Sequence, residues 1–269
     1  VFSSMALEDT ANNVIITGDY GYYNEQTEKA LATRRAVLKQ VYGEDTLFLH
    51  ADTLRADPVE KGAEKKLVRA FHHVQFYRYD LQGRCDSMVY DFRDSTNTFY
   101  HDPVIWAQGN QITANEIKLY TREKNLVKAE MINNAFLIAP EDSVNFNQIK
   151  GKMMTGYFRD NQLYKIDVDG SGQTVYYPKD QEYVIGVNRA ESSSLTIFLK
   201  DRVVETIIMR KQPAGNMNPP YVLDEEAVRL RGFQWLEKYR PKSYEDIFEF
   251  PEIVDKVETT DYSDYEYSD

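Results

Sequence analysis

A short motif occurs six times along the chain, and this repetition restricts the possible folds more than any other feature. Each unit begins with a small residue, usually followed by a polar residue, and continues as alternating apolar and polar positions. The six units begin at Gly18, Ala51, Cys85, Ala114, Gly151 and Ala190. The spacings of 33, 34, 29, 37 and 39 residues fall in the range of repeat architectures, so one structural unit is used repeatedly.

Each unit is interpreted as a strand, a polar turn and a second strand. Alternation with a period of two gives a strand one apolar face, which here holds mostly Leu, Ile, Met, Phe and Tyr. The first unit, with Gly21 and Tyr23 on this face, breaks the trend. A strand pair with one apolar face has to stack on its neighbours, so we predict an all-β, elongated antiparallel body. The register of the second strands is less determined, because a slip of one residue reverses the faces.

Composition excludes several classes of protein. The 43 acidic and 32 basic residues give a net charge of −11, which disfavours binding to nucleic acid or to an anionic membrane. No apolar run is long enough for a transmembrane helix. The residues 1–5 lack the features of a signal peptide and begin without Met, so we expect a targeting segment to have been removed. The single Cys85 fits a reducing compartment or a bacterial periplasm.

The C-terminal part has a different pattern. A break rich in Pro, Gly and Asn at 213–220 is followed by Asp224, a good N-cap, and a helix is predicted from there to about Tyr239. A second short helical turn is predicted over 243–248, and the seven acids and one Lys of 252–269 predict a disordered tail. The predicted organisation is a β body over 1–220, a helical extension over 221–251 and an acidic tail over 252–269.

Metal sites find little support. The segment 167–172 matches the opening of a calcium loop, but Pro178 stands where a bidentate Glu is needed, so we interpret it as a Gly-rich kink or bulge. His72 and His73 are adjacent and would point to opposite faces of a strand. His50 and His101 are isolated, so structural histidines are preferred over a zinc site. No metal and no cofactor are expected.

Catalytic signatures are absent from the sequence, which has neither a Gly-x-Ser-x-Gly elbow nor a phosphate-binding loop. We therefore expect that the protein is not an enzyme. The abundance of carboxylates keeps open a carbohydrate-active enzyme, which would need two carboxylates about 5–10 Å apart in a polar cleft.

Five stretches resemble the OstA/LptA-like proteins of lipopolysaccharide transport, and more closely the longer OstA-like proteins of Bacteroidetes. They are 51–57, 102–116, 169–178, 186–193 and 240–243, within a resemblance that covers roughly 14–250. The resemblance implies a β-jellyroll folded as a V-shaped trough. It also implies that lipid A acyl chains bind inside, and that edge strands pair with neighbouring jellyrolls.

The resemblance thus implies a periplasmic, non-enzymatic lipopolysaccharide carrier or bridge. Its implied partners are lipopolysaccharide and other jellyroll proteins, with self-association left open. Each buried CH₂ group contributes about 0.8 kcal/mol, so a continuous apolar trough matters more than a cationic one. The residues expected to line the trough are Leu54, Val74, Phe76, Met88, Tyr90, Phe92, Trp106, Ile117, Leu119, Phe136, Met154, Phe158 and Ile166. The alternative is a structural or adhesin-like β scaffold that binds only proteins and has a closed core.

Overall fold

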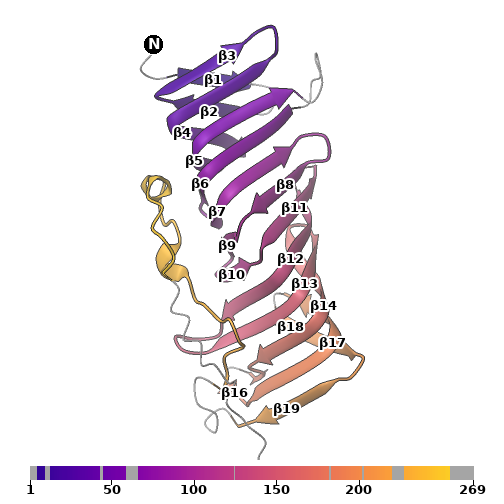
Figure 1. The fold of residues 1–269 in the computed structure, drawn as a ribbon. Helices are drawn as coiled ribbons and strands as arrows, with labels where there is room; N and C mark the ends of the chain where they lie inside the picture. Colours follow the sequence, from indigo (N-terminus) through magenta and orange to yellow (C-terminus); the bar gives the residue numbers. More distant parts are fainter. Residues whose placement is uncertain are drawn as a thin grey trace, which may run out of the picture.

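The protein is an elongated stack of antiparallel strands, seen in a computed structural model (Figure 1). The structure describes residues 5–9, 13–42, 45–58, 66–123, 125–181, 183–201, 203–219 and 227–254. Within these residues there are strands, turns and two short 3₁₀ turns but no α-helix, which confirms the all-β prediction for the body.

The strands follow one another along the stack in sequence order. The first ten are β1 (Met5–Asp9), β2 (Val14–Gly18), β3 (Tyr20–Asn24), β4 (Lys29–Tyr42), β5 (Asp45–Pro58), β6 (Lys66–Arg78), β7 (Leu81–Asp91), β8 (Thr96–Tyr100), β9 (Val104–Ala107) and β10 (Asn110–Thr113). The others are β11 (Glu116–Arg122), β12 (Asn125–Pro140), β13 (Phe146–Arg159), β14 (Gln162–Tyr176), β15 (Lys179–Asp180), β16 (Tyr183–Val184), β17 (Val187–Lys200), β18 (Val203–Arg210) and β19 (Ala214–Asn218). All but β15 and β16, which form a separate small hairpin, belong to one sheet of 17 strands.

Pairing in this sheet is antiparallel and joins strands that are close in sequence. For example, β4 pairs with β5, β5 with β6 and β6 with β7. The same pattern continues through β12, β13, β14 and β17. In a repeat architecture each unit contacts only its neighbours, and the strand pairing therefore agrees with the repeat predicted from the spacing of the units.

A corner divides the long strands into two halves. Pairs of residues with left-handed backbone occur at the same level of alternate strands, at 34–35, 72–73, 101–102, 133–134, 170–171 and 211–212. In the register of β4 with β5, Arg34 and Arg35 lie opposite the single residue Asp52, which is a β-bulge. The equivalent bulge of β6 against β7 sets His72 and His73 opposite Asp86. Repeated bulges at one level fold the whole sheet over on itself.

The folded sheet has two halves, which we call arm 1 and arm 2. Arm 1 holds residues 5–9, 14–18, 36–42, 45–51, 74–78, 81–85, 104–107, 110–113, 135–140, 146–151, 172–176, 187–192 and 214–218. Arm 2 holds residues 20–24, 29–33, 53–58, 66–71, 87–91, 96–100, 116–122, 125–132, 153–159, 162–169, 194–200 and 203–210.

The small residues that begin the units lie at the corner. Ala51, Cys85 and Ala114 are all buried there, because the inner side of a sharp bend leaves no space for a larger side chain. The sixth unit departs from the prediction. The residue opposite the bulge 170–171 is Ser193, so this unit begins at Ser192 and not at Ala190. A shift of two residues keeps the same face, and Leu195 therefore points inward as predicted.

The segment 227–254, which we call the strap, lies outside the sheet and runs along the stack (yellow in Figure 1). The predicted helix up to Tyr239 is wrong for the described part, which is irregular except for the 3₁₀ turn η1 (Glu237–Tyr239). A second 3₁₀ turn, η2 (Glu245–Phe248), coincides with the predicted short helical turn. Gly232 has a φ of +86°, which interrupts a helix. The acidic tail beyond 254 and the start of the predicted helix lie outside the described residues.

Candidate functional site

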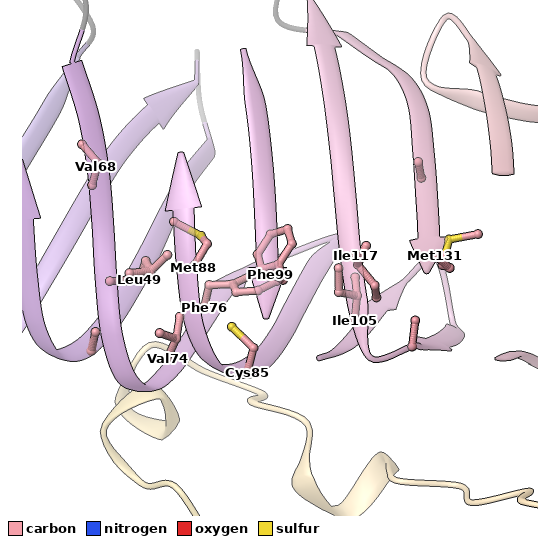
Figure 2. Packing of buried hydrophobic residues seen from close by; sticks show 14 of the residues in the cluster. Leu49, Val68, Val74, Phe76, Cys85, Met88, Phe99, Ile105, Ile117 and Met131 are labelled. Atoms are coloured by element: carbon pink, nitrogen blue, oxygen red, sulfur yellow. The ribbon is translucent and has the colours of Figure 1, made fainter. Parts of the chain in front are cut away.

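Between the arms lies one apolar interior that extends from β2 to β17. It forms a single cluster of buried side chains, to which both arms contribute. In Figure 2, Val74 and Cys85 lie near the bend of the strands, and Met88, Phe99 and Ile117 lie further along. The strand register aligns these side chains. One inner row of arm 2 runs through Ala32, Leu54, Ala70, Met88, Phe99, Ile117, Met131, Met154, Val168 and Leu195.

Eleven of the thirteen residues expected to line a trough belong to this interior. Seven are buried members of the cluster, namely Leu54, Val74, Phe76, Met88, Ile117, Met154 and Ile166. Four are partly buried and pack against it, namely Tyr90, Phe92, Leu119 and Phe158. The rings of Tyr90 and Phe92 meet edge to face with centroids 4.3 Å apart, and burial raises the pKa of the Tyr90 hydroxyl.

Trp106 and Phe136 are placed differently from the expectation. Both lie on the outer face of arm 1 beneath the strap, Trp106 at 0% exposure beside Leu236 and Phe136 at 5% exposure in a cluster with Leu230. Their neighbours Ile105 and Leu137 point into the interior instead. The cause is the one-residue ambiguity of a strand that is apolar on both faces.

The strap is bound by glutamines that are fully buried on the outer face of arm 1. Gln148 donates a hydrogen bond of 2.8 Å to the Val228 carbonyl and accepts one of 2.8 Å from the Leu230 N–H. Gln111 makes the equivalent pair of bonds six residues further along the strap. It donates a hydrogen bond of 2.7 Å to the Gln234 carbonyl and accepts one of 2.7 Å from the Leu236 N–H. These bonds replace helical ones, which explains why this part of the strap stays extended.

The glutamines belong to one row across the arm. The register aligns Tyr77, Gln82, Trp106, Gln111, Ile138, Gln148, Val175 and Arg189. Glutamine therefore recurs on every second strand, about 10 Å apart. Sequence reasoning missed this site, although the continuous apolar runs 104–106 and 135–138 are a signal of strands buried on both faces.

The far end of the strap packs on cationic and histidine side chains. The Phe248 ring lies 4.3 Å from the Arg35 guanidinium and 5.0 Å from the His50 ring. Phe250 lies 3.9 Å from the guanidinium of Arg84, which donates a hydrogen bond to the Pro251 carbonyl. Burial lowers the pKa of His50, so this imidazole is stabilised in its neutral form.

Comparisons with known proteins give a distant likeness among solved structures. No family model matches the chain, and no curated protein matches it. Among solved structures it is similar to LptH, the LptA homologous periplasmic component of the conserved lipopolysaccharide transport device from Pseudomonas aeruginosa. The sequence identity is 12%, the match covers 52% of this chain and 95% of LptH, and the TM-score is 0.40. At this level the likeness transfers neither residue roles nor function.

The histidines and carboxylates noted in the sequence have structural surroundings. His72 and His73 both belong to one corner bulge and contact Asp86 at 3.1 Å and Asp52 at 2.8 Å. The segment 167–172 contains the corner of β14, with a φ of +76° at Gly170, which confirms its interpretation as a kink with a bulge. The described residues contain no group of three or more His, Cys, Asp or Glu side chains placed to hold a metal ion. They also contain no helix that could span a membrane.

The two ends of the sheet are edge strands. At the C-terminal end, β18 pairs with β17 through residues 203–210, and the described residues place no strand on its other side. Val203, Ile208 and Met209 on β18 are 62%, 39% and 37% exposed. At the N-terminal end, β3 carries the exposed Tyr20 and Tyr22. A long edge strand with exposed apolar residues is a site for pairing with another strand.

Proposed function

We propose that this protein is a periplasmic, non-enzymatic carrier or bridge for lipopolysaccharide. In this proposal, the interior shields lipid A acyl chains and the sheet edges dock on other jellyroll proteins. The observation that carries the proposal is the single apolar interior between two arms, continuous along the stack. The proposal includes kinship with the longer OstA-like proteins of Bacteroidetes.

The composition of the interior suits an acyl ligand. Met88 and Met154 are flexible and polarizable, so they adapt to chains of different shape. The half-buried Phe92 and Phe158 lie where the arms end and would cover the outer part of a chain. Each CH₂ group removed from water contributes about 0.8 kcal/mol, and this free energy offsets the cost of separating the packed arms locally.

The placement of the strap supports docking through the sheet edges. The strap contacts arm 1 from outside, through Gln148 near one end of the sheet and Gln75 near the other. It therefore leaves the edge strand β18 available for strand addition.

Photo-crosslinking to lipopolysaccharide tests the ligand. Benzoylphenylalanine in place of Phe92 or Met154 is expected to crosslink the lipid, because both side chains belong to the interior. Thr155 is the matched control, since it is the next residue of β13 and points to the outer face of arm 2. Equal labelling from Met154 and Thr155, or none from Phe92 and Met154, would contradict the proposal.

The second candidate is a β scaffold that binds only proteins, and the dense packing of the interior favours it. Leu54, Ile117 and Met154 are all about 1% exposed, as in a closed core. Mass spectrometry of lipids extracted from the purified protein separates the candidates. Retained lipid A supports the carrier, and its absence after incubation with lipid A supports the scaffold.

A further inference from the structure

The two walls of the interior differ in how they are supported from outside. The strap covers the outer face of arm 1 and binds it through buried glutamines such as Gln111 and Gln148. Among the described residues, no segment covers the outer face of arm 2. In the part of the chain that the structure describes, arm 1 therefore lies between two packed layers, whereas arm 2 has one packed layer. A displacement of arm 2 breaks fewer contacts than a displacement of arm 1.

The inner side of arm 2 changes along the stack. In β4, β5 and β6 most inward positions are alanine, namely Ala30, Ala32, Ala56 and Ala70. From β7 onward, Asn97, Ala129 and Gly156 are the exceptions in the same two rows, which otherwise hold larger side chains. These are Met88, Tyr90, Phe99, Ile117, Leu119, Met131, Met154, Ile166, Leu195 and Ile197. Since alanine contributes little apolar area, the wall over β4–β6 contributes less inward apolar area per strand than the wall from β7 to β17.

From these two differences we infer that acyl chains are admitted over β4–β6, where the alanine-lined wall of arm 2 swings away from the strapped arm 1. The inference rests on the proposed function and adds the place and the moving part. The first chain then occupies the volume that the alanines leave between the separated arms. The facing surface of arm 1 supplies Leu38, Leu49 and Phe76, which stay in place as the fixed wall.

Distances between spin labels test this inference in the full chain. Cys85 is buried and is replaced by Ala, so that labels report only from introduced cysteines. The first pair, Gln26→Cys with Asp45→Cys, lies across the ends of the two arms near β4. The second pair, Ser143→Cys with Gln162→Cys, is the matched control across the arms at β13. The third pair, Tyr79→Cys with Lys242→Cys, joins arm 1 to the strap.

Purified lipid A is added, and its binding is measured on the same samples by co-elution. The first pair is expected to lengthen by about 5 Å, half of the roughly 10 Å that separates packed sheets, while the other two pairs keep their distances. If lipid A binds and the β13 pair lengthens as much as the first, or no pair lengthens, the inference is wrong and the carrier function stands. If lipid A does not bind, the proposed function fails and the inference fails with it.

A pair of substitutions tests the place independently. Ala56→Leu fills the wall over β5, and Ala129→Leu adds the same volume in the same inner row of β12. Ala56→Leu is expected to weaken lipid A binding about tenfold and Ala129→Leu by less than twofold, with thermal unfolding showing that both variants fold. Equal effects, or a larger effect of Ala129→Leu, would contradict the inference.

Discussion

Arm 1 and arm 2 are halves of the same strands, yet their outer faces are built on different principles. On arm 1 the outer face is a second core, where Trp106 and Phe136 pack under the strap. On arm 2 it carries surface ion pairs such as Lys128 with Glu130 at 2.9 Å and Lys165 with Asp167 at 2.6 Å. Exposed pairs of this kind contribute at most about 1 kcal/mol each, so arm 2 depends on its inner face for stability.

The difference shows how a repeat protein gains long-range connection. When strands pair only with their neighbours, the stability of each unit depends almost entirely on that unit and the units next to it. The strap contacts strands far apart in sequence, from Gln148 on β13 to Gln75 on β6, and so links units that do not touch one another.

Removal of the strap by ending the chain after residue 219 is the strongest test. It takes away the buried Leu230, Leu236 and Ile247 and exposes Trp106 and Phe136. At about 2 kcal/mol for each large buried side chain, the loss is several kcal/mol, a large part of the stability of a typical domain. In the shortened chain, denaturant unfolding followed by a probe on arm 1 is expected to show a separate transition at a lower denaturant concentration. A single transition at the original midpoint would contradict the role of the strap.

Replacement of one aromatic residue on each outer face compares the arms directly. Trp106→Ala is expected to cost about 3–5 kcal/mol, because it leaves a cavity between β9 and the strap. Tyr157→Ala on arm 2 removes a ring that contacts the Lys165 ammonium at 4.6 Å and is expected to cost about 1 kcal/mol. Urea denaturation of both variants gives the two free energies, and equal losses would mean that the outer faces are alike.

The sequence predicted arm 2 better than arm 1, for a physical reason. On arm 2 a simple alternation separates the inward Met88 from the outward Val89, so period-two reasoning assigns the faces correctly. In arm 1 both faces of Ile105–Trp106 are buried, and alternation gives no direction. The local sequence pattern of the strap predicts a helix, whereas in the structure its N–H groups bind Gln111 and Gln148, which are far away in sequence.

Truncation of a strap-binding glutamine has a smaller effect. Gln148→Ala leaves the Leu230 N–H and the Val228 carbonyl buried without their partner and is expected to cost about 1–3 kcal/mol. Gln173→Ala is the matched control, on the same arm but only half-buried and bonded to Glu191 at 3.5 Å, with an expected change of about 0.5 kcal/mol. Hydrogen exchange at Leu230 is expected to accelerate only in Gln148→Ala. Similar exchange in both variants would show that the glutamine does not hold the strap.

Acidification is expected to change the free energy of unfolding only slightly, and in opposite directions through His50 and His72, because their surroundings differ. His50 lies under Phe248 and burial lowers its pKa below 6.5, so the unfolded chain binds a proton more readily than the folded one. Its contribution to stability is present above pH 6.5 and declines as the pH falls through 6.5 toward the lower folded value. His72 has a raised pKa because of Asp86, and its contribution is present below pH 6.5 and is lost as the pH rises. His50→Gln is therefore expected to flatten the loss of stability between about pH 7 and 5, whereas His72→Gln steepens it. The measurement is the unfolding midpoint of each variant across this pH range. If the midpoint changes with pH to the same extent in both variants, burial under the strap does not control the protonation of His50.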